Sequence, residues 1–367
     1  MPSSPTPLDH LLAIVRNPAQ PWDPALQPAV WKAVKKQATI HGFTGLLANN
    51  AAAWLPSSER PWHDRVLTDH YRRYKARMAL LCSLIQACDA EGIPCVSLKG
   101  PLFGERFCPA PFLKKSGDLD LLIGEADIGR AARLMQRLGG RISGRDPWRV
   151  HSRWSHHVTF IFGPQESTTP VEIHSRLSMA GVQSIPSEAF VDRSVKWNSA
   201  EGFTANVLSP ADEAFYLAVH AASHCFHRLR WLYDAILTAR LLDDRGNEQV
   251  RELVRRYRQA GRYIPAATAA KEFFGNVLSP DCSDLPRSWL CGFMTPNHIR
   301  GMISRPQGIR LTAAQRLAYL FDWCCMTDSL WGAVQVSARW TGYRASQLYL
   351  LAVRAQGPDA LARTIPG

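Results

Sequence analysis

A chain of 367 residues is long enough to bury two substantial hydrophobic cores, and its 46% apolar content excludes an intrinsically disordered protein. Lysine and arginine outnumber aspartate and glutamate by 43 to 31, a formal net charge of +12 that favours polyanionic or nucleotide ligands. The nine cysteines form no C-x-x-C pair, and no segment approaches the ~20 apolar residues of a membrane-spanning helix. We therefore expect a globular, cytoplasmic protein that makes no contact with a membrane.

Basic runs occur on predicted helices, as in Arg72–Lys75 and Arg255–Arg258. Such runs are more often solvated helix faces than nucleic-acid sites. No recognised nucleic-acid-binding motif accompanies them, so nucleic acid is not the favoured partner.

The first ninety residues predict helices, because apolar residues recur there at three- and four-residue spacing. The apolar periods are Leu8–Val15, Val30–Leu47 and Leu67–Ala90. The proline-rich stretches Pro21–Pro24 and Pro56–Pro61 separate them, since proline cannot continue through a helix interior. We expect residues 1–90 to form a helical N-terminal region.

From Gly92 onward, short apolar strands alternate with polar loops and one helix. The predicted strands are Ile93–Leu98, Leu119–Ile123, Val158–Phe162 and Val171–His174. The helix is amphipathic, covers Glu125–Leu138 and ends at a pair of glycines. This order predicts a small α/β core over residues 91–208.

Beyond Ser209 the apolar spacing is helical again. Predicted helices cover Asp212–Asp243, as one long helix or a bent pair, then Asn247–Ala260, and Ala313–Ala355 as two or more helices. The segment Pro280–Pro306 contains four prolines and is the most loop-like. We expect residues 209–367 to form a helical C-terminal domain, which gives the whole chain an α+β fold.

The sharpest chemical signal is the pair Asp118 and Asp120, two residues apart on a predicted strand. Because side chains alternate along a strand, both carboxylates lie on one face, while Leu119 and Leu121 point into the core. Two like charges at this spacing are costly unless a cation neutralises them. Hard carboxylate oxygens suit Mg²⁺.

Glu172 is a candidate third carboxylate, because it stands alone in the apolar strand Val171–His174. Three such acids can hold two metal ions ~4 Å apart, which would polarise an attacking oxygen and neutralise a leaving pyrophosphate. A single Asp-x-Asp pair is more often a solvated turn or a helix cap. Here it lies between Ser97–Gly100 upstream and the Glu172 strand downstream, which is the order a nucleotidyltransferase needs.

These segments resemble the bacterial "uncharacterised nucleotidyltransferase" family of the polymerase-β superfamily, over most of the chain. The similarity includes Gly92–Gly100, the Asp-hydrophobic-Asp-Leu-Leu strand, the Glu-hydrophobic-His strand, and the helical segments His220–His224 and Leu229–Asp234. It implies a small polymerase-β-type nucleotidyltransferase sheet with flanking helices, embedded between helical N- and C-terminal regions. It also implies that Asp118, Asp120 and Glu172 are catalytic ligands of Mg²⁺, with two ions bound.

The resemblance further places the nucleotide-binding turn at Lys99-Gly100. The family usually has Gly-Ser or Gly-Gly in this turn, whereas Pro101 follows here and has no N–H to donate to phosphate. Lys99 would compensate as a cationic phosphate contact.

Five other residues are implied to bind nucleotide. Where the family has an arginine four residues before the first aspartate, this chain has Lys114 with Lys115 beside it, which keeps the charge but not the bidentate fork. His220, His224 and Arg230 would face the cleft and contact phosphate or acceptor. Ordinary capping or core hydrogen bonding is an equally good interpretation of these three residues.

Other histidines and an acid have weaker signals. His220, His224 and His227 share a helix face and could in principle bind zinc, but no acid or cysteine of matching geometry accompanies them. Asp234 could anchor Arg230 or a histidine and so fix its helix against the sheet, and it is interpreted as structural. Of the histidines at strand ends, His174 is the better candidate for the cleft, because it neighbours Glu172.

The sequence thus predicts a magnesium-dependent nucleotidyltransferase that moves a nucleotidyl group from a nucleoside triphosphate to an acceptor. The acceptor stays open among a peptide, a protein side chain, a small metabolite and an RNA end, with a ribosomal peptide suggested by the resemblance. Two alternatives are a catalytically silent nucleotide-binding regulator on the same fold and an RNA-binding helical protein that uses the basic charge.

Overall fold

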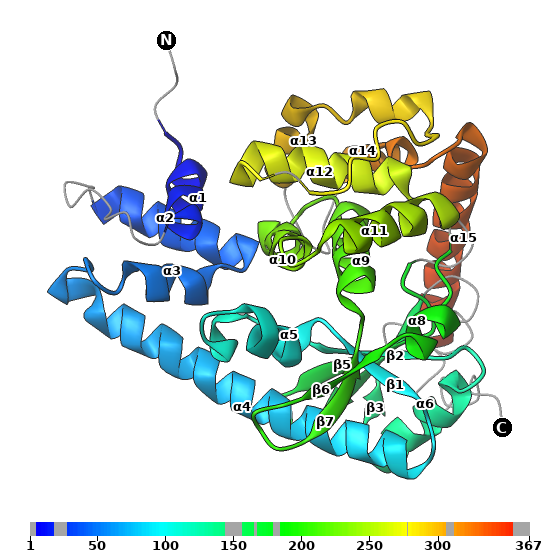
Figure 1. Ribbon diagram of the computed structural model, residues 1–367, viewed down its shortest axis with the longest axis horizontal. Helices are drawn as coiled ribbons and strands as arrows, with labels where there is room; N and C mark the ends of the chain where they lie inside the picture. Colours follow the sequence, from blue (N-terminus) through cyan, green and yellow to red (C-terminus); the bar gives the residue numbers. More distant parts are fainter. Residues whose placement is uncertain are drawn as a thin grey trace.

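The computed structural model describes residues 5–17, 28–143, 156–164, 167–178, 184–276, 278–305 and 312–354. It shows an α+β fold in which one mixed sheet is flanked by helices (Figure 1). The predicted turn Pro21–Pro24 lies outside the described residues.

The described part of the chain forms a seven-stranded sheet in the order β3-β4-β5-β2-β1-β7-β6. Its strands are β1 (Cys95–Leu98), β2 (Leu119–Ile123), β3 (Arg141–Ile142), β4 (His157–Phe162), β5 (Thr169–His174), β6 (Val195–Asn198) and β7 (Thr204–Val207). β2 runs parallel to β5, and β1 parallel to β7, while the other neighbours are antiparallel. All four predicted strands are confirmed. β3, β6 and β7 were not predicted, because they are short and partly exposed.

Each face of the sheet packs into its own hydrophobic cluster. Leu119 and Leu121 belong to a cluster with residues of α4 (Arg60–Ala90) and α6 (Ile128–Arg137). Leu122 belongs to the other cluster, which is formed largely by the C-terminal helices. In Figure 1, α4 runs beneath the sheet and the C-terminal helices lie above it. The predicted alternation is confirmed, and it leaves Asp120 on the face toward the C-terminal helices.

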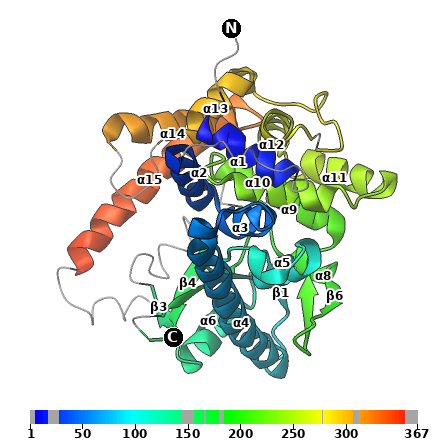
Figure 2. The same ribbon diagram turned by 90° about the vertical axis from the view of Figure 1, so that its left-hand side faces the viewer.

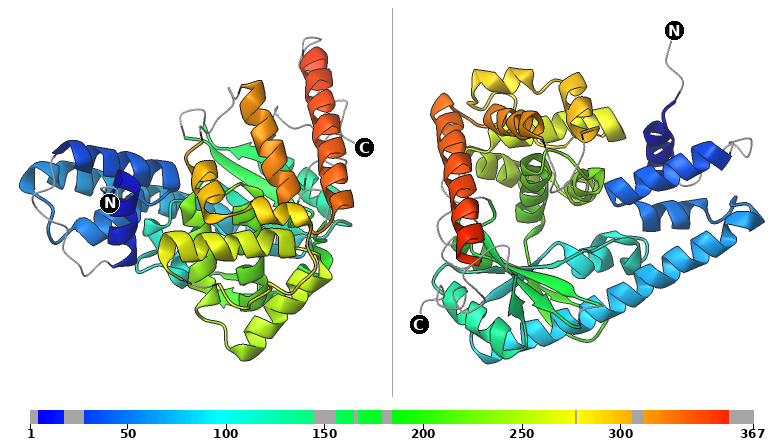
Figure 3. Two further views of the ribbon diagram at one scale, coloured as in Figure 1. Left: turned by 90° about the horizontal axis from the view of Figure 1, so that it is seen from above. Right: turned by 180° about the vertical axis from the view of Figure 1, so that it is seen from behind.

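The N-terminal region is helical, as expected. Its elements are α1 (Pro7–Arg16), α2 (Pro28–His41), α3 (Thr44–Ala51), the short 3₁₀ helix η1 (Ser57–Glu59) and α4. The period Val30–Leu47 is split into α2 and α3, because Gly42 has φ +80°, which ends a right-handed helix. α4 begins before Leu67, because Pro61 occupies its first turn, where a missing N–H costs no hydrogen bond. Figure 3 shows α4 spanning the molecule from α3 to the sheet.

Between the strands lie α5 (Gly100–Phe107), η2 (Pro111–Leu113), α6 and α8 (Glu188–Asp192). α5 was not predicted, because Gly100-Pro101 has the composition of a turn. Proline in the first turn instead opens the helix.

The C-terminal part is helical throughout most of its described length. Its elements are α9 (Pro210–Ser223), α10 (Leu229–Ala239), α11 (Asp244–Arg256), α12 (Ala260–Phe274), η3 (Trp289–Phe293), α13 (Pro296–Ile303), α14 (Ala313–Cys325) and α15 (Leu330–Arg354). The segment Asp212–Asp243 is the bent pair α9 and α10, which Cys225 and Phe226 separate with φ of 52° and 55°. The loop-like interpretation of Pro280–Pro306 is wrong over η3 and α13. Figure 2 shows α15 at the side of this layer.

All nine cysteines carry free thiols. Among the helices described, none combines the length and the apolar character that crossing a membrane requires.

Candidate functional site

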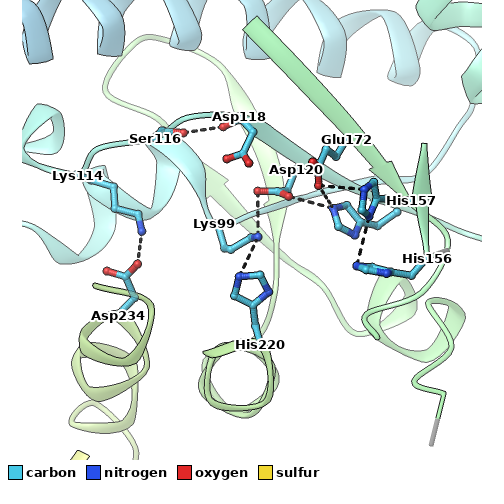
Figure 4. Close-up of polar contacts among 11 residues, drawn as sticks. Lys99, Lys114, Ser116, Asp118, Asp120, His156, His157, Glu172, His220 and Asp234 are labelled. Atoms are coloured by element: carbon cyan, nitrogen blue, oxygen red, sulfur yellow. Dashed lines mark hydrogen bonds and ion pairs between the residues drawn. The ribbon is translucent and has the colours of Figure 1, made fainter. Parts of the chain in front are cut away.

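The predicted acids meet where β2 and β5 lie side by side. Asp120 is the register partner of Glu172 on β5, and Leu98 at the end of β1 pairs with Asp120 from the other side. Asp118 directly precedes β2. Figure 4 shows the carboxylates of Asp118, Asp120 and Glu172 close together. The sheet register therefore brings together the three acids that the sequence pointed to.

His174 connects two of these acids. Its Nε2 lies 3.0 Å from Oδ1 of Asp120 and 3.4 Å from Oε2 of Glu172. One ligand atom from each of Asp120, Glu172 and His174 lies within 4.8 Å of the others. Two carboxylates and an imidazole at this spacing fit a divalent cation, and Asp118 stands beside them as a further carboxylate.

Lys99 supplies positive charge at the same point. Its Nζ lies 3.3 Å from Oδ2 of Asp120 and 3.5 Å from Nε2 of His220. Burial opposes ionisation of both partners, but their attraction raises the pKa of Lys99 and holds the pKa of Asp120 well below its usual range. Lys99 has φ +39°, a left-handed conformation that few lysines adopt. A strained backbone thus holds this ammonium against the acids.

Among the described residues, no ion pair like those of Asp120 is formed by Asp118, on which Lys99, His174 and Arg77 act at longer range. Burial, followed by repulsion from Asp120, raises the pKa of Asp118 to about 6. Glu172 differs again: burial opposes its ionisation, but the hydrogen bond from His174 together with the charges of His157 and His174 lowers its pKa. Of the three acids, Asp118 is therefore the one whose charged form the surroundings favour least.

The predicted nucleotide-binding turn lies next to the strand that carries the acids. Gly100 opens α5 with φ +69°, and a side chain added there would have Ser116 Oγ, at 3.8 Å, as its nearest neighbour. Ser116 Oγ donates a hydrogen bond of 2.6 Å to the backbone carbonyl of Asp118. The N-terminus of α5 thus faces the loop that leads into β2.

Lys114 and Arg230 are joined to each other through one acid rather than to the carboxylate cluster. Lys114 forms a buried ion pair with Asp234, and Arg230 Nε donates a 2.6 Å hydrogen bond to the same carboxylate. Arg230 also contacts the Sγ of Cys108 at 3.1 Å. The predicted anchoring of Arg230 by Asp234 is confirmed, and the pair Lys114–Asp234 stands apart from Asp118 and Asp120 in Figure 4.

Lys115 lines a small basic pocket that also reaches the nucleotide-binding turn. The pocket is lined by His70, Arg73, Tyr74, Arg77, Pro101, Lys114, Lys115 and Ser116. Partial burial and the charges of Arg228, Arg73 and Arg77 lower the pKa of Lys115. The Nε of Arg77 is buried without a hydrogen-bond partner. Such a group of cations attracts anions.

The sequence interpretation missed two of these cations. Arg73 belongs to a run that was interpreted as a solvated helix face, and Arg77 was not considered. Their spacing of four residues puts them on one side of α4, which was a usable signal. It could not be connected to the acids without knowing that α4 passes beside Ser116.

The histidines of α9 lie against Lys99 and each other. The ring centroids of His220 and His224 are 4.5 Å apart. Burial, reinforced by Lys99, lowers the pKa of His224 to about 3 and that of His220 well below its usual value, so both are neutral. The ring of His227 instead packs 4.9 Å from that of Tyr319. In the described ranges these three histidines do not converge on one metal position.

A mixed sheet with acids on two adjoining strands, and a glycine that opens a helix beside them, defines a nucleotidyltransferase-type α+β fold. Comparison with known families agrees with this class. The sequence profile of the family described as "Uncharacterised nucleotidyltransferase" matches residues 27–275, a range that contains every residue of the site. The chain therefore belongs to this family of transferases. None of the curated proteins compared with the chain matches it.

Proposed function

We propose that this protein transfers a nucleotidyl group from a nucleoside triphosphate to an acceptor, and that Asp118, Asp120 and Glu172 hold the Mg²⁺ that the reaction needs. The observation that carries the proposal is the register of β2 and β5, which aligns Asp120 with Glu172 and leaves Asp118 beside them. Bound Mg²⁺ supplies charge that polarises the α-phosphoryl group and offsets the leaving pyrophosphate.

The protein's own cations would position the triphosphate. Lys99 is buried beside Asp120, and its ammonium also donates toward the neutral His220, so its direction is fixed before a phosphate binds. Lys115 and Arg77 line the small pocket beside the α5 turn, and their charges would attract the β- and γ-phosphates at its mouth. Because Lys114 and Arg230 share Asp234, we assign them the role of holding α10 in place rather than of contacting the phosphates directly.

The acceptor would approach from the Glu172 side of the site. The side chain of Glu172 is 23% exposed, whereas that of Asp120 is 1% exposed. An acceptor oxygen would attack the α-phosphorus in line with the bond to the β-phosphate, that bond would break, and pyrophosphate would leave. Peptide, protein, metabolite and RNA hydroxyls all satisfy this chemistry.

Calorimetric titration of a nonhydrolysable nucleoside triphosphate tests the proposal. We expect binding to the wild type with Mg²⁺, loss of that binding with a chelator, and loss in the variant Asp118→Asn/Asp120→Asn. Asp284→Asn, in an exposed ion pair with Arg251, is the control and should bind like the wild type. Absence of binding in the wild type would refute the proposal. RNA affinity that is steeply salt-dependent and survives in the double variant would instead favour the RNA-binding alternative.

Arg77→Met tests the phosphate pocket separately. Loss of one charge-assisted contact costs about 1.5–3 kcal/mol, which is roughly a tenfold or greater loss of affinity. We expect this loss for the triphosphate and little change for the monophosphate, whose phosphate does not extend to these cations. Arg72→Met, at an exposed position on the same helix, is the matched control. Equal weakening of both nucleotides by Arg77→Met would contradict the assignment.

A further inference from the structure

Three histidine rings gather at the edge of the carboxylate cluster. His157 begins β4 and is the register partner of His174 on β5, so the two side chains share one face of the sheet, and His156 precedes them. The ring centroids are 4.6 Å apart for His156 and His157, 5.3 Å for His156 and His174, and 5.1 Å for His157 and His174. One ring nitrogen from each lies within 4.8 Å of the other two.

The spacing of the first pair suits two ligands of one ion. Nδ1 of His157 lies 3.3 Å from Nε2 of His156. Two nitrogens bound at ~2.05 Å to a tetrahedral zinc ion are about 3.3 Å apart. A ring nitrogen of His174 lies within 4.8 Å of a ring nitrogen of each of the other two histidines, so it is near enough to be the third ligand. A nitrogen trio of this kind suits Zn²⁺ and similar borderline ions better than Mg²⁺, which prefers oxygen.

A buried nitrogen of His174 also needs a partner. Its Nδ1 is buried without a hydrogen-bond partner. A polar atom left in this state is costly unless a ligand or ion satisfies it. This unsatisfied nitrogen is therefore a second observation, independent of the spacing, that points to a bound ligand.

The carboxylates give His174 the support that metal-binding histidines usually have. Its Nε2 faces Asp120 and Glu172 at 3.0 and 3.4 Å, while its Nδ1 is the nitrogen without a partner. A histidine ligand commonly directs its second ring nitrogen at a carboxylate, which fixes the ring and strengthens the metal bond.

We propose that His156, His157 and His174 bind a divalent transition-metal ion of the zinc class, with a fourth position open toward Glu172. This site is distinct from the magnesium site proposed at Asp118, Asp120 and Glu172, because its ligands are nitrogens and it does not depend on nucleotidyl transfer. The two sites adjoin through His174, so an ion in the imidazole site lies next to the acid that an acceptor would meet.

Titration of the chelator-treated full chain with ZnCl₂ and with CoCl₂ tests the site. We expect one Zn²⁺ to bind per chain in calorimetry, and Co²⁺ to give the visible absorption of a tetrahedral site without thiolate charge transfer. His156→Ala and His157→Ala should each weaken binding at least about tenfold, the loss that even an outer partner's removal causes. His70→Ala, on α4 away from the trio, and Asp118→Asn should both leave Zn²⁺ binding unchanged.

His157→Gln is the second variant, because it keeps most of the side-chain volume if the alanine variants unfold. Zinc binding that is absent in the wild type, or that persists unweakened in the folded His156 and His157 variants, would overturn the proposal. A thiolate-to-cobalt band would assign the ion to cysteine and do the same. Zinc binding without magnesium-dependent nucleotide binding would refute the transfer proposal alone.

Discussion

Replacing Asp118 with asparagine should stabilise the metal-free protein at neutral pH while removing its Mg²⁺ response. Burial and the neighbouring Asp120 raise the pKa of Asp118 from 3.8 to about 6. The charged carboxylate therefore has a higher free energy in the folded protein than in the unfolded chain. Asparagine has nearly the same shape and cannot ionise. The substitution therefore removes a charge that destabilises the folded protein.

The magnitude follows from the size of the pKa difference. Each pKa unit corresponds to about 1.4 kcal/mol, so a rise from 3.8 to about 6 destabilises the folded state by up to about 3 kcal/mol above pH 6. Between pH 4 and pH 6 the folded state binds more protons than the unfolded state, and the free energy of unfolding falls as pH rises through this window. Below pH 4 the contribution disappears.

Urea denaturation of the wild type and Asp118→Asn between pH 4 and pH 8, with a chelator present, measures this effect. We expect the advantage of the variant to grow from near zero at pH 4 and to level off above pH 6.5. Adding Mg²⁺ should then stabilise the wild type and leave the variant unchanged. A variant that is no more stable than the wild type at pH 8 would refute the reasoning.

Two further substitutions test how the site is supported. Asp234→Ala leaves two buried cations without their shared acid and should lower the free energy of unfolding in urea by about 3–5 kcal/mol. Asp284→Ala, in an exposed ion pair, should lower it by less than about 1 kcal/mol. Similar losses in the two variants would contradict the structural role assigned to Asp234. Gly261→Ala would place a methyl group 2.7 Å from the backbone of Thr327 and should lower the free energy of unfolding by about 1–3 kcal/mol, while Gly301→Ala, which meets nothing within 4 Å, should be neutral or slightly stabilising.

The sequence contained enough to find the acids and the strands that carry them. Asp118, Asp120 and Glu172 interrupt apolar runs of strand-like period, and the same alternation that buries Leu119 and Leu121 places Asp120 on the opposite face. These features are local, since each strand carries its own pattern. The pairing of β2 with β5 is not local, and only the order of the segments along the chain hinted at it.

The sequence alone could not show which basic side chains are paired inside the protein and which face the site. Lys114 and Lys115 are adjacent, yet the side chain of Lys114 is 5% exposed and paired with Asp234, whereas Lys115 is exposed beside a pocket. Which of the two lysines is buried in an ion pair depends on how α10 packs against the loop before β2. Arg77 is the opposite example. It lies on a helix rich in charged residues, and it reaches the site only because α4 runs beneath the sheet.

The conformation of Lys99 connects the fold of the site with its charge. A non-glycine residue at φ +39° costs about 1–3 kcal/mol, and glycine at this position would avoid that cost. Glycine would also remove the ammonium that Asp120 contacts at 3.3 Å, and would leave the buried carboxylate with His174 alone. Removing one partner of a buried ion pair costs about 3–5 kcal/mol, more than the backbone strain. The strained lysine is therefore the more stable choice at this turn, and the same ion pair holds a cation where a triphosphate would bind.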